Sequence, residues 1–418
     1  MSALSVYSPI GYLVVSMILL GVAATPIFGA ADASWHAQTH RASTIDGLRG
    51  FLAIAVFFHH ATIYHRYLAD GVWEIPPSVF YTQLGQSAVI LFFMITGYLF
   101  WGKAIAAEGK IDWRSLYIGR IFRIGPMYYL VTVAMLALVL RQTGLHLREP
   151  VSAVVHEFTR LSLLGYYGPG SLNGYPNSWV ILAGVTWTLH YEWLFYLLVL
   201  PISAILFARR SVHLPYAAIG FAVAILMLFR HPTLNSSGYA AFFSGMLCSS
   251  LRTTGFCIGP QRHVNLIASG ITILLLGVLA RMPSAYSAIP ILLLAAVFFL
   301  CSSGCSVFGL LNWRASKRLG EISYGIYLLQ GLVLYAFLRP HSLRTFALGS
   351  ASAYWALVLL AALTLITSAL IAHVVIEKPG IRAGRRIALA LNPPSPAQPF
   401  GAAEHPAKGP ATGSGASV

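Results

Sequence analysis

The chain has 418 residues, of which 57% are apolar and only 9% carry a charge. An ordinary soluble protein has about 25% charged residues, so this chain has too little charge to cover a water-facing surface. The composition therefore excludes a soluble enzyme, a disordered chain and a coiled coil. Because apolar runs of about 20 residues recur along the sequence, we predict an all-α polytopic membrane protein.

Eleven apolar runs predict about 11 transmembrane helices. They lie at about 9–30, 46–64, 85–102, 123–140, 189–207, 214–229, 237–251, 264–280, 285–303, 320–338 and 352–376. The segment 141–188 is long enough to contain a partial or interfacial helix. Residues 1–8 contain no Lys or Arg, so we favour an uncleaved first span over a signal peptide.

The formal net charge of +15 would suggest nucleic-acid binding in a soluble protein. In a membrane protein, basic residues instead collect in cytoplasmic loops. If the loop before the second span is cytoplasmic, 19 Lys and Arg lie on the cytoplasmic side and 8 on the opposite side. We therefore expect a multi-pass protein of the cell membrane, the inner membrane in a bacterium, with a cytoplasmic C-terminus and no nucleic-acid partner. The four cysteines lack metal-binding spacing, so no metal site is predicted.

The second span carries polar groups that are costly inside a membrane. It begins with Asp46 and Arg49 and continues to His59 and His60. Arg49 and His60 are separated by about three full helical turns, or about 16 Å, so they share one face of the helix. This arrangement places an anion-binding group at the membrane surface and a general base inside the membrane. The alternative is a capped helix whose histidine bonds to a neighbour in the core.

Two further groups of polar residues are candidates for the site. Arg120 and Arg123 share a helix face at the entrance of the fourth span and match the geometry of phosphate, although arginines there also anchor helices. Glu192 lies in an aromatic block that includes Trp187 and Tyr191. Counting back from the end of its span places Glu192 about 25 Å from the cytoplasmic edge, further out than His60. A structural hydrogen bond is the alternative role for Glu192.

Together these segments resemble the acyltransferase-3 family of integral membrane O-acyltransferases from about residue 43 to 379. The resemblance rests on Asp46-Gly47-Leu48-Arg49-Gly50, the spacing from Arg49 to His60, Leu91-Phe92-Phe93-Met94-Ile95-Thr96-Gly97-Tyr98, Arg120-x-x-Arg123, the block Trp187 to Tyr196, Ile322-Ser323-Tyr324-Gly325-Ile326-Tyr327-Leu328 and Ile376-Glu377-Lys378-Pro379. Family members often have serine in place of Thr96, which keeps the hydroxyl, and histidine in place of Gln330. Glutamine can form hydrogen bonds but cannot act as a base near neutral pH.

The resemblance implies a core of ten helices. The expected domains are then an additional N-terminal helix and linker (1–42), a membrane acyltransferase domain (43–380) and a cytoplasmic, largely disordered tail (381–418). The implied activity moves an acyl group, acetyl by preference, from cytoplasmic acyl-CoA to a hydroxyl of a glycan or other acceptor. Acyl-CoA is a donor substrate, and no tightly bound cofactor is expected.

Site roles follow from the resemblance and from the residues themselves. The expected catalytic residues are His60, Glu192 and Asp46, and the expected donor-binding residues are Arg49, Arg120 and Arg123. The expected substrate-binding residues are His59, Tyr191 and Trp187. A transporter or a lipid-linked glycan flippase is the alternative function, since either would also contain several spans and buried polar residues.

Overall fold

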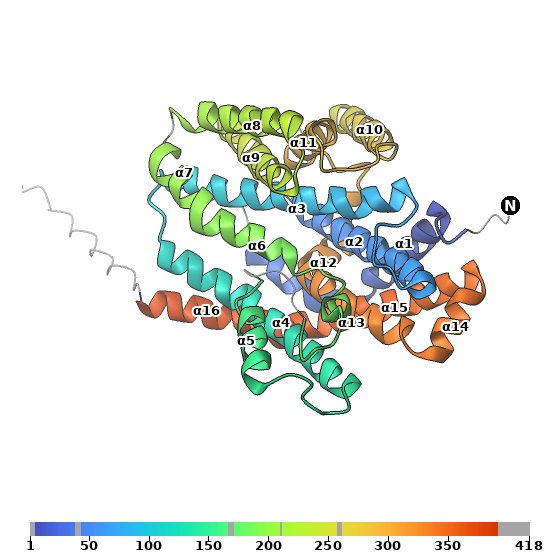
Figure 1. Ribbon diagram of the computed structural model, residues 1–418. Helices are drawn as coiled ribbons and strands as arrows, with labels where there is room; N and C mark the ends of the chain where they lie inside the picture. The colour runs from blue at the N-terminus through green and yellow to red at the C-terminus, as the bar shows by residue number, and fades with distance from the viewer. Residues whose placement is uncertain (1–4, 38–42, 166–170, 210, 257–260, 392–418) are drawn as a thin grey trace, which may run out of the picture.

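The computed structural model describes residues 5–37, 43–165, 171–209, 211–256 and 261–391, which are helical and contain no strand (Figure 1). The first half contains α1 (Pro9–Ala24), η1 (Pro26–Ala37), α2 (Ser43–Asp70), α3 (Val79–Ala106), α4 (Trp113–Gln142), α5 (Val151–Leu161), η2 (Ser178–Leu182), α6 (Trp187–Leu194), η3 (Phe195–Val199) and α7 (Leu200–Phe207). The second half contains α8 (His213–Arg230), α9 (Leu234–Thr253), α10 (Arg262–Leu279), α11 (Ala288–Ser302), η4 (Leu310–Asn312), α12 (Arg314–Glu321), α13 (Ser323–Leu338), α14 (His341–Gly349), α15 (Ala351–Ala372), η5 (His373–Glu377) and α16 (Lys378–Leu391).

Length and hydropathy together identify fewer candidate membrane spans than the eleven predicted, so the predicted count is not confirmed. Within the described ranges, six helical segments are long and apolar enough to cross a membrane, or up to eight if each of two bent pairs is one span. Each of the eleven predicted runs coincides with a helix, but three of these helices differ from an ordinary span. α2 contains arginine and histidine, α9 is rich in serine, and α11 has only 15 residues. The polar side chains of α2 therefore lower its mean hydropathy below that of an ordinary membrane span.

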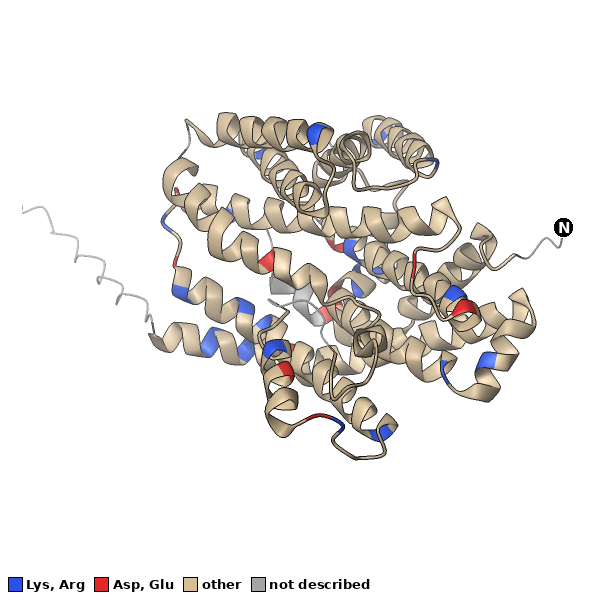
Figure 2. Ribbon diagram, viewed as in Figure 1, with Lys and Arg blue, Asp and Glu red and all other residues tan. Residues whose placement is uncertain are grey.

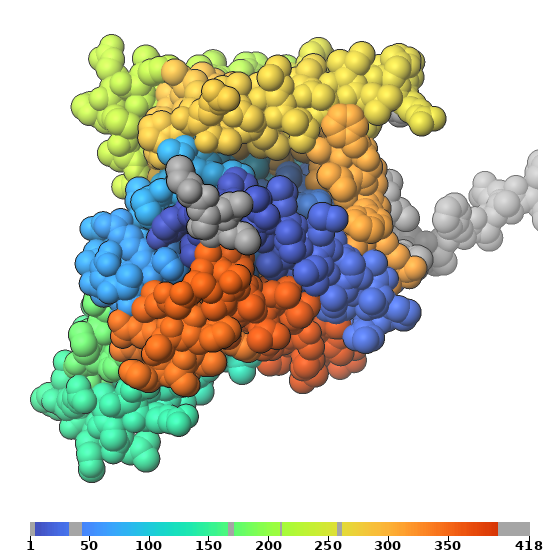
Figure 3. Space-filling model, turned by 90° about the vertical axis from the view of Figure 1, so that its right-hand side faces the viewer, coloured from blue at the N-terminus to red at the C-terminus, as the bar shows by residue number. Residues whose placement is uncertain are grey.

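The polar helix α2 lies inside the bundle. It packs against α12, α3 and α13, and α3 in turn packs against α9. In Figure 1, α2 lies behind α3 and beside α12 and α13. The end of the molecule shown in Figure 3 has the orange α13–α15 region against the blue N-terminal helices. Burial on all sides allows α2 to hold polar side chains away from lipid.

The N-terminal segment is attached to the helices that follow it. Asp32 of η1 forms ion pairs with Arg314 and Arg318 of α12. The buried Arg318 also donates to the carbonyl groups of Ala23, Ala24 and Thr25 at the end of α1. Because the last carbonyls of a helix lack helical donors, this arginine stabilises the C-terminus of α1. The segment thus packs onto the bundle.

Two regions outside the predicted spans have defined structure. The expected partial helix within 141–188 is α5, and η2 follows it as a buried turn whose Val180 carbonyl accepts from Tyr64 of α2. The predicted tail 381–418 begins inside α16, so its first residues are helical rather than disordered. Residues 392–418 lie outside the described part of the chain.

Candidate active site

His60 is held in one orientation by a hydrogen-bond chain from α13. The amide nitrogen of Gln330 donates to the Tyr327 carbonyl at 2.9 Å, which turns its oxygen toward His60. This oxygen lies 3.3 Å from Nδ1 of His60. A carbonyl oxygen only accepts hydrogen bonds, so Nδ1 carries the proton and Nε2 has the free lone pair of a base. Gln330, a departure from the family pattern, thus sets the tautomer of the histidine.

His59 lies in the packing between two helices. Its Nδ1 is 2.8 Å from the Tyr81 carbonyl of α3. A side chain at Gly85 would overlap its ring, since an added Cβ would lie 2.3 Å from it. The glycine therefore makes space for a buried histidine. These contacts favour a structural role for His59. Its side chain points toward α3, whereas the His60 side chain points toward Gln330 of α13.

Arg49 and Asp46 lie one helical turn apart at the start of α2. Their side chains form an ion pair at 3.8 Å, and Arg49 is buried. The carboxylate of Asp46 therefore balances and positions the guanidinium. The positive charges of Arg120, Arg123 and Arg49 all act on the Glu192 carboxyl, so α2, α4 and α6 place their charged groups around one region.

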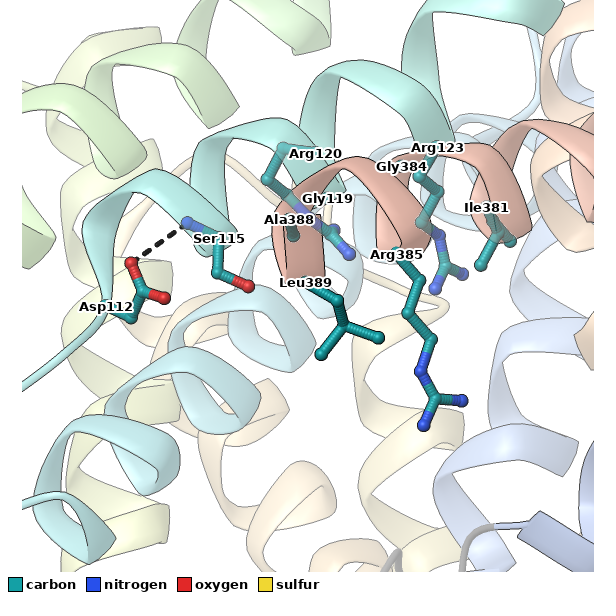
Figure 4. Close-up of a pocket in the computed structure, with 10 residues that line it drawn as sticks. All are labelled: Asp112, Ser115, Gly119, Arg120, Arg123, Ile381, Gly384, Arg385, Ala388 and Leu389. Carbon is teal, nitrogen blue, oxygen red and sulfur yellow. Dashed lines mark hydrogen bonds between the residues drawn. The ribbon is translucent and has the colours of Figure 1, made fainter. Parts of the chain in front are cut away.

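The arginine cavity is the space between α4 and α16 that Arg120, Arg123 and Arg385 line. It has a volume of about 380 Å³. Figure 4 shows the three arginine side chains extending to the same side of the helix pair. The Arg120 guanidinium also lies over the Phe100 ring, 4.9 Å from its centroid. Three positive charges around one cavity favour a ligand with several negative charges.

Close helix packing creates this cavity. Pro126 interrupts α4 one turn after Arg123. Proline lacks the N–H that would bond to the carbonyl four residues earlier, so the carbonyl of Phe122 is left without that donor. Gly380 and Gly384 of α16 lie against Phe122, where an added Cβ would come within 2.7 and 2.6 Å of its atoms. Two glycines four residues apart allow helix backbones to approach closely in a membrane.

Arg385 is the site residue that sequence reasoning missed. A signal was present, because Gly380 and Gly384 precede it at helical spacing and basic residues recur in the same segment. Figure 2 shows Lys and Arg gathered on α16 and on the adjacent part of α4. The predicted boundary at residue 381 assigned Arg385 to the tail, whereas the residue lies on α16.

Glu192 is not where its position in the sequence suggested. The expected location was further out than His60, whereas its carboxyl lies under the influence of Arg120, Arg123 and Arg49. It accepts a hydrogen bond from Tyr196 at 3.0 Å. The reason is the path of the preceding chain: η2 is buried against α13 and α4, so α6 begins inside the bundle. The π-helical turn η3 follows Glu192, and such turns are frequent at functional sites.

Tyr191 and Trp187 occupy a neighbouring region of α6. The Tyr191 hydroxyl donates to Asn235 of α9 at 2.6 Å. Trp187 packs edge-on against Tyr191, with ring centroids 5.6 Å apart, and both lie beside Phe93 of α3. These contacts connect α6 with α3 and α9, and a substrate-binding role for the two residues remains a prediction.

Apolar helices that surround buried polar side chains define the chain as a membrane protein. A sequence model of the Acyl_transf_3 family, described as an acyltransferase domain, matches residues 43–373. The chain therefore belongs to the acyltransferase-3 family and is a membrane acyltransferase. No curated protein and no solved structure matches the chain.

Proposed function

We propose that the chain is an acyl-CoA-dependent O-acyltransferase that transfers an acyl group, acetyl by preference, to a hydroxyl of a glycan or other acceptor. The observation that carries the proposal is His60, whose Nδ1 faces the Gln330 oxygen and whose Nε2 is left as a base. It lies on the same helix face as Arg49, about 16 Å along α2. Arg49 acts on the carboxyl of Glu192 together with Arg120 and Arg123, which line the arginine cavity.

The donor occupies the arginine cavity in this proposal. Acyl-CoA carries several phosphate charges, and Arg120, Arg123 and Arg385 offer planar donor groups that pair with phosphate oxygens. Arg49 extends the positive region toward the interior of the bundle. Because acyl-CoA is a charged cytoplasmic metabolite, the cavity would open to the cytoplasm. That orientation agrees with the excess of basic residues on this side in the sequence.

The chemical step would use the free Nε2 of His60. It takes the proton of the acceptor hydroxyl while the hydroxyl oxygen forms a bond with the thioester carbonyl carbon. The carbon–sulfur bond then breaks, and the proton passes from His60 to the departing thiolate, which leaves as coenzyme A. Glu192 and Asp46 would support this step indirectly, because their carboxylates position the arginines that hold the donor.

The test uses the full chain in lipid nanodiscs. We expect equilibrium binding of labelled acetyl-CoA, and transfer of the label to material in membranes of the native host. His60→Ala should bind acetyl-CoA and lose transfer. A wild-type protein that neither binds nor consumes acetyl-CoA would overturn the proposal and favour a transporter or flippase.

The orientation is tested separately with single cysteines. Lys110→Cys lies between α3 and α4 at the arginine end, and Leu147→Cys lies in the loop after α4. In a background without native cysteines, an impermeant thiol reagent added outside intact cells should label only Leu147→Cys. Labelling of Lys110→Cys from outside would invert the topology and exclude a cytoplasmic donor route.

A further inference from the structure

An aromatic cluster extends from His60 toward the other end of α2. It consists of Tyr64, Tyr67, Trp73, Tyr175, Trp179 and Tyr335. Trp73 lies at its centre and stacks against the His60 ring, with centroids 6.3 Å apart and planes inclined by 24°. It also makes edge contacts with Tyr64 at 5.0 Å and with Trp179 at 5.8 Å. The imidazole of His60 is therefore continuous with an aromatic surface.

The cluster is assembled from four parts of the chain. His60, Tyr64 and Tyr67 lie four and three residues apart on α2, so they share one helix face over about 10 Å. Trp73 follows α2, Trp179 belongs to the buried turn η2, and Tyr335 belongs to α13. Segments that are distant in the sequence therefore bring their rings together.

The cluster combines packed and accessible rings. Tyr64 and Tyr335 are buried, whereas Tyr67, Trp73, Tyr175 and Trp179 are partly exposed, as is His60. The hydroxyls of Tyr175 and Tyr335 lie 3.5 Å apart. Rings that served only to fill the core would be buried throughout. Here accessible ring faces and phenol hydroxyls lie between the surface and the proposed base.

One cation lies beside the cluster. Arg339 caps the C-terminus of α13, where its backbone N–H donates to the Tyr335 carbonyl at 3.0 Å. Its exposed side chain lies near the phenols of Tyr67, Tyr175 and Tyr335. Across the described ranges, Arg339 forms no ion pair with a carboxylate. Its planar guanidinium is thus available to an anion that approaches along the aromatic surface.

We propose that the aromatic cluster and Arg339 form the acceptor site, and that the acceptor unit is a saccharide that carries a carboxylate or a phosphate. Aromatic faces pack against the apolar faces of a sugar ring, while phenol hydroxyls bond to its hydroxyl groups. Arg339 pairs with the anionic substituent and so orients the ring. A sugar hydroxyl at the inner end of the cluster then reaches Nε2 of His60. This assignment rests on the proposed acyltransferase function.

The experiment measures saccharide binding and acetyl-CoA binding on the same full-length protein in nanodiscs. The probes are two matched pairs: glucuronic acid with neutral glucose, and mannose 6-phosphate with mannose. We expect at least one anionic probe to bind about 10-fold more tightly than its neutral partner, since a hydrogen bond to a charged group contributes about 1.5 kcal/mol or more. Arg339→Gln should abolish this preference. Trp179→Ala should weaken binding of the anionic probe and its neutral partner.

Arg281→Gln is the matched control, because Arg281 is an exposed arginine after α10 and lies outside the cluster. All three variants should bind acetyl-CoA as the wild type does. The inference is overturned if no probe binds, if each anionic probe binds no better than its neutral partner, or if Arg339→Gln behaves like Arg281→Gln. Each of these results leaves the proposed function intact when acetyl-CoA still binds. Loss of acetyl-CoA binding by the wild type would instead overturn the proposed function.

Discussion

The arginine cavity lies between α4 and α16, the aromatic cluster lies along the second half of α2, and the two regions are built by different means. The cavity has a volume of about 380 Å³ and is lined by three arginines from two helices that glycines bring together. The cluster consists of rings in edge-to-face contact with one arginine beside them. The first region suits a highly charged ligand and the second a ring-shaped one. His60 belongs to neither region. Along α2 it lies between Arg49 and Tyr64 of the aromatic cluster, and the proposed reaction would pass the acyl group from one ligand to the other there.

The largest expected effect is at His60. His60→Ala should lower acyl transfer by about 10²- to 10⁴-fold, because it removes the general base between the two regions. Transfer of labelled acetyl groups and the amount of protein in the membrane should both be measured.

His59→Gln is the matched control for this experiment. His59 contacts Tyr81 and Gly85 of α3, so its loss should lower thermal stability and leave activity per folded molecule within a few fold. If His59→Gln abolished transfer and His60→Ala did not, the assignment of the base would be reversed.

The next effect distinguishes donor binding from chemistry. Arg120→Ala or Arg123→Ala should raise the acyl-CoA concentration needed for half-maximal rate by about 10- to 150-fold, the equivalent of about 1.5–3 kcal/mol. Lysine at either position should restore only part of the affinity, since it lacks the planar fork. Arg114→Ala is the control, because Arg114 is exposed on α4 and does not line the cavity. If the double variant needed the same acyl-CoA concentration for half-maximal rate as the wild type, the two arginines would serve only to anchor the helix.

A smaller effect is expected at Gln330, which acts through His60. Gln330→Leu removes the acceptor for Nδ1 and leaves the tautomer unspecified, so kcat should fall by about 10-fold, the equivalent of one hydrogen bond of about 1.4 kcal/mol. The acyl-CoA KM should not change. Gln330→Glu keeps an acceptor oxygen and should recover activity with a shifted pH profile. Equal losses in the Leu and Glu variants, without that shift, would indicate packing alone.

The smallest expected effect concerns the wall formed by α16. Arg385→Gln should weaken acyl-CoA binding by about 3- to 10-fold, because it removes one of three charges. Gly384→Leu should weaken it at least as much, since a side chain there meets Phe122 and moves the helix. Gly277→Leu is the control, because no atom lies near an added Cβ at that glycine. If Gly384→Leu left donor binding unchanged, α16 would not be part of the donor site.

Helical periodicity and apolar runs predicted much of this architecture, because both depend on local sequence. Each predicted run contains a helix, and α2 carries both Arg49 and His60. The position of Glu192 was wrong because it depends on η2, whose burial between helices leaves no periodic signal in the sequence. Arg385 was missed because its role depends on the contact of Gly384 with Phe122 from a distant helix. The positions of both residues therefore depend on packing between segments that are distant in the sequence, which composition does not reveal.

The arginine cavity also has a consequence for biosynthesis. Its walls come from α4 and α16, so a growing chain that has already inserted its helices up to α15 has only one of them. If the cavity binds a coenzyme A thioester as proposed, a half-made chain has no complete cavity in which to hold one. A chain that stops before α16 would accordingly insert into the membrane without a donor site, so synthesis of the last helix would also complete the binding site.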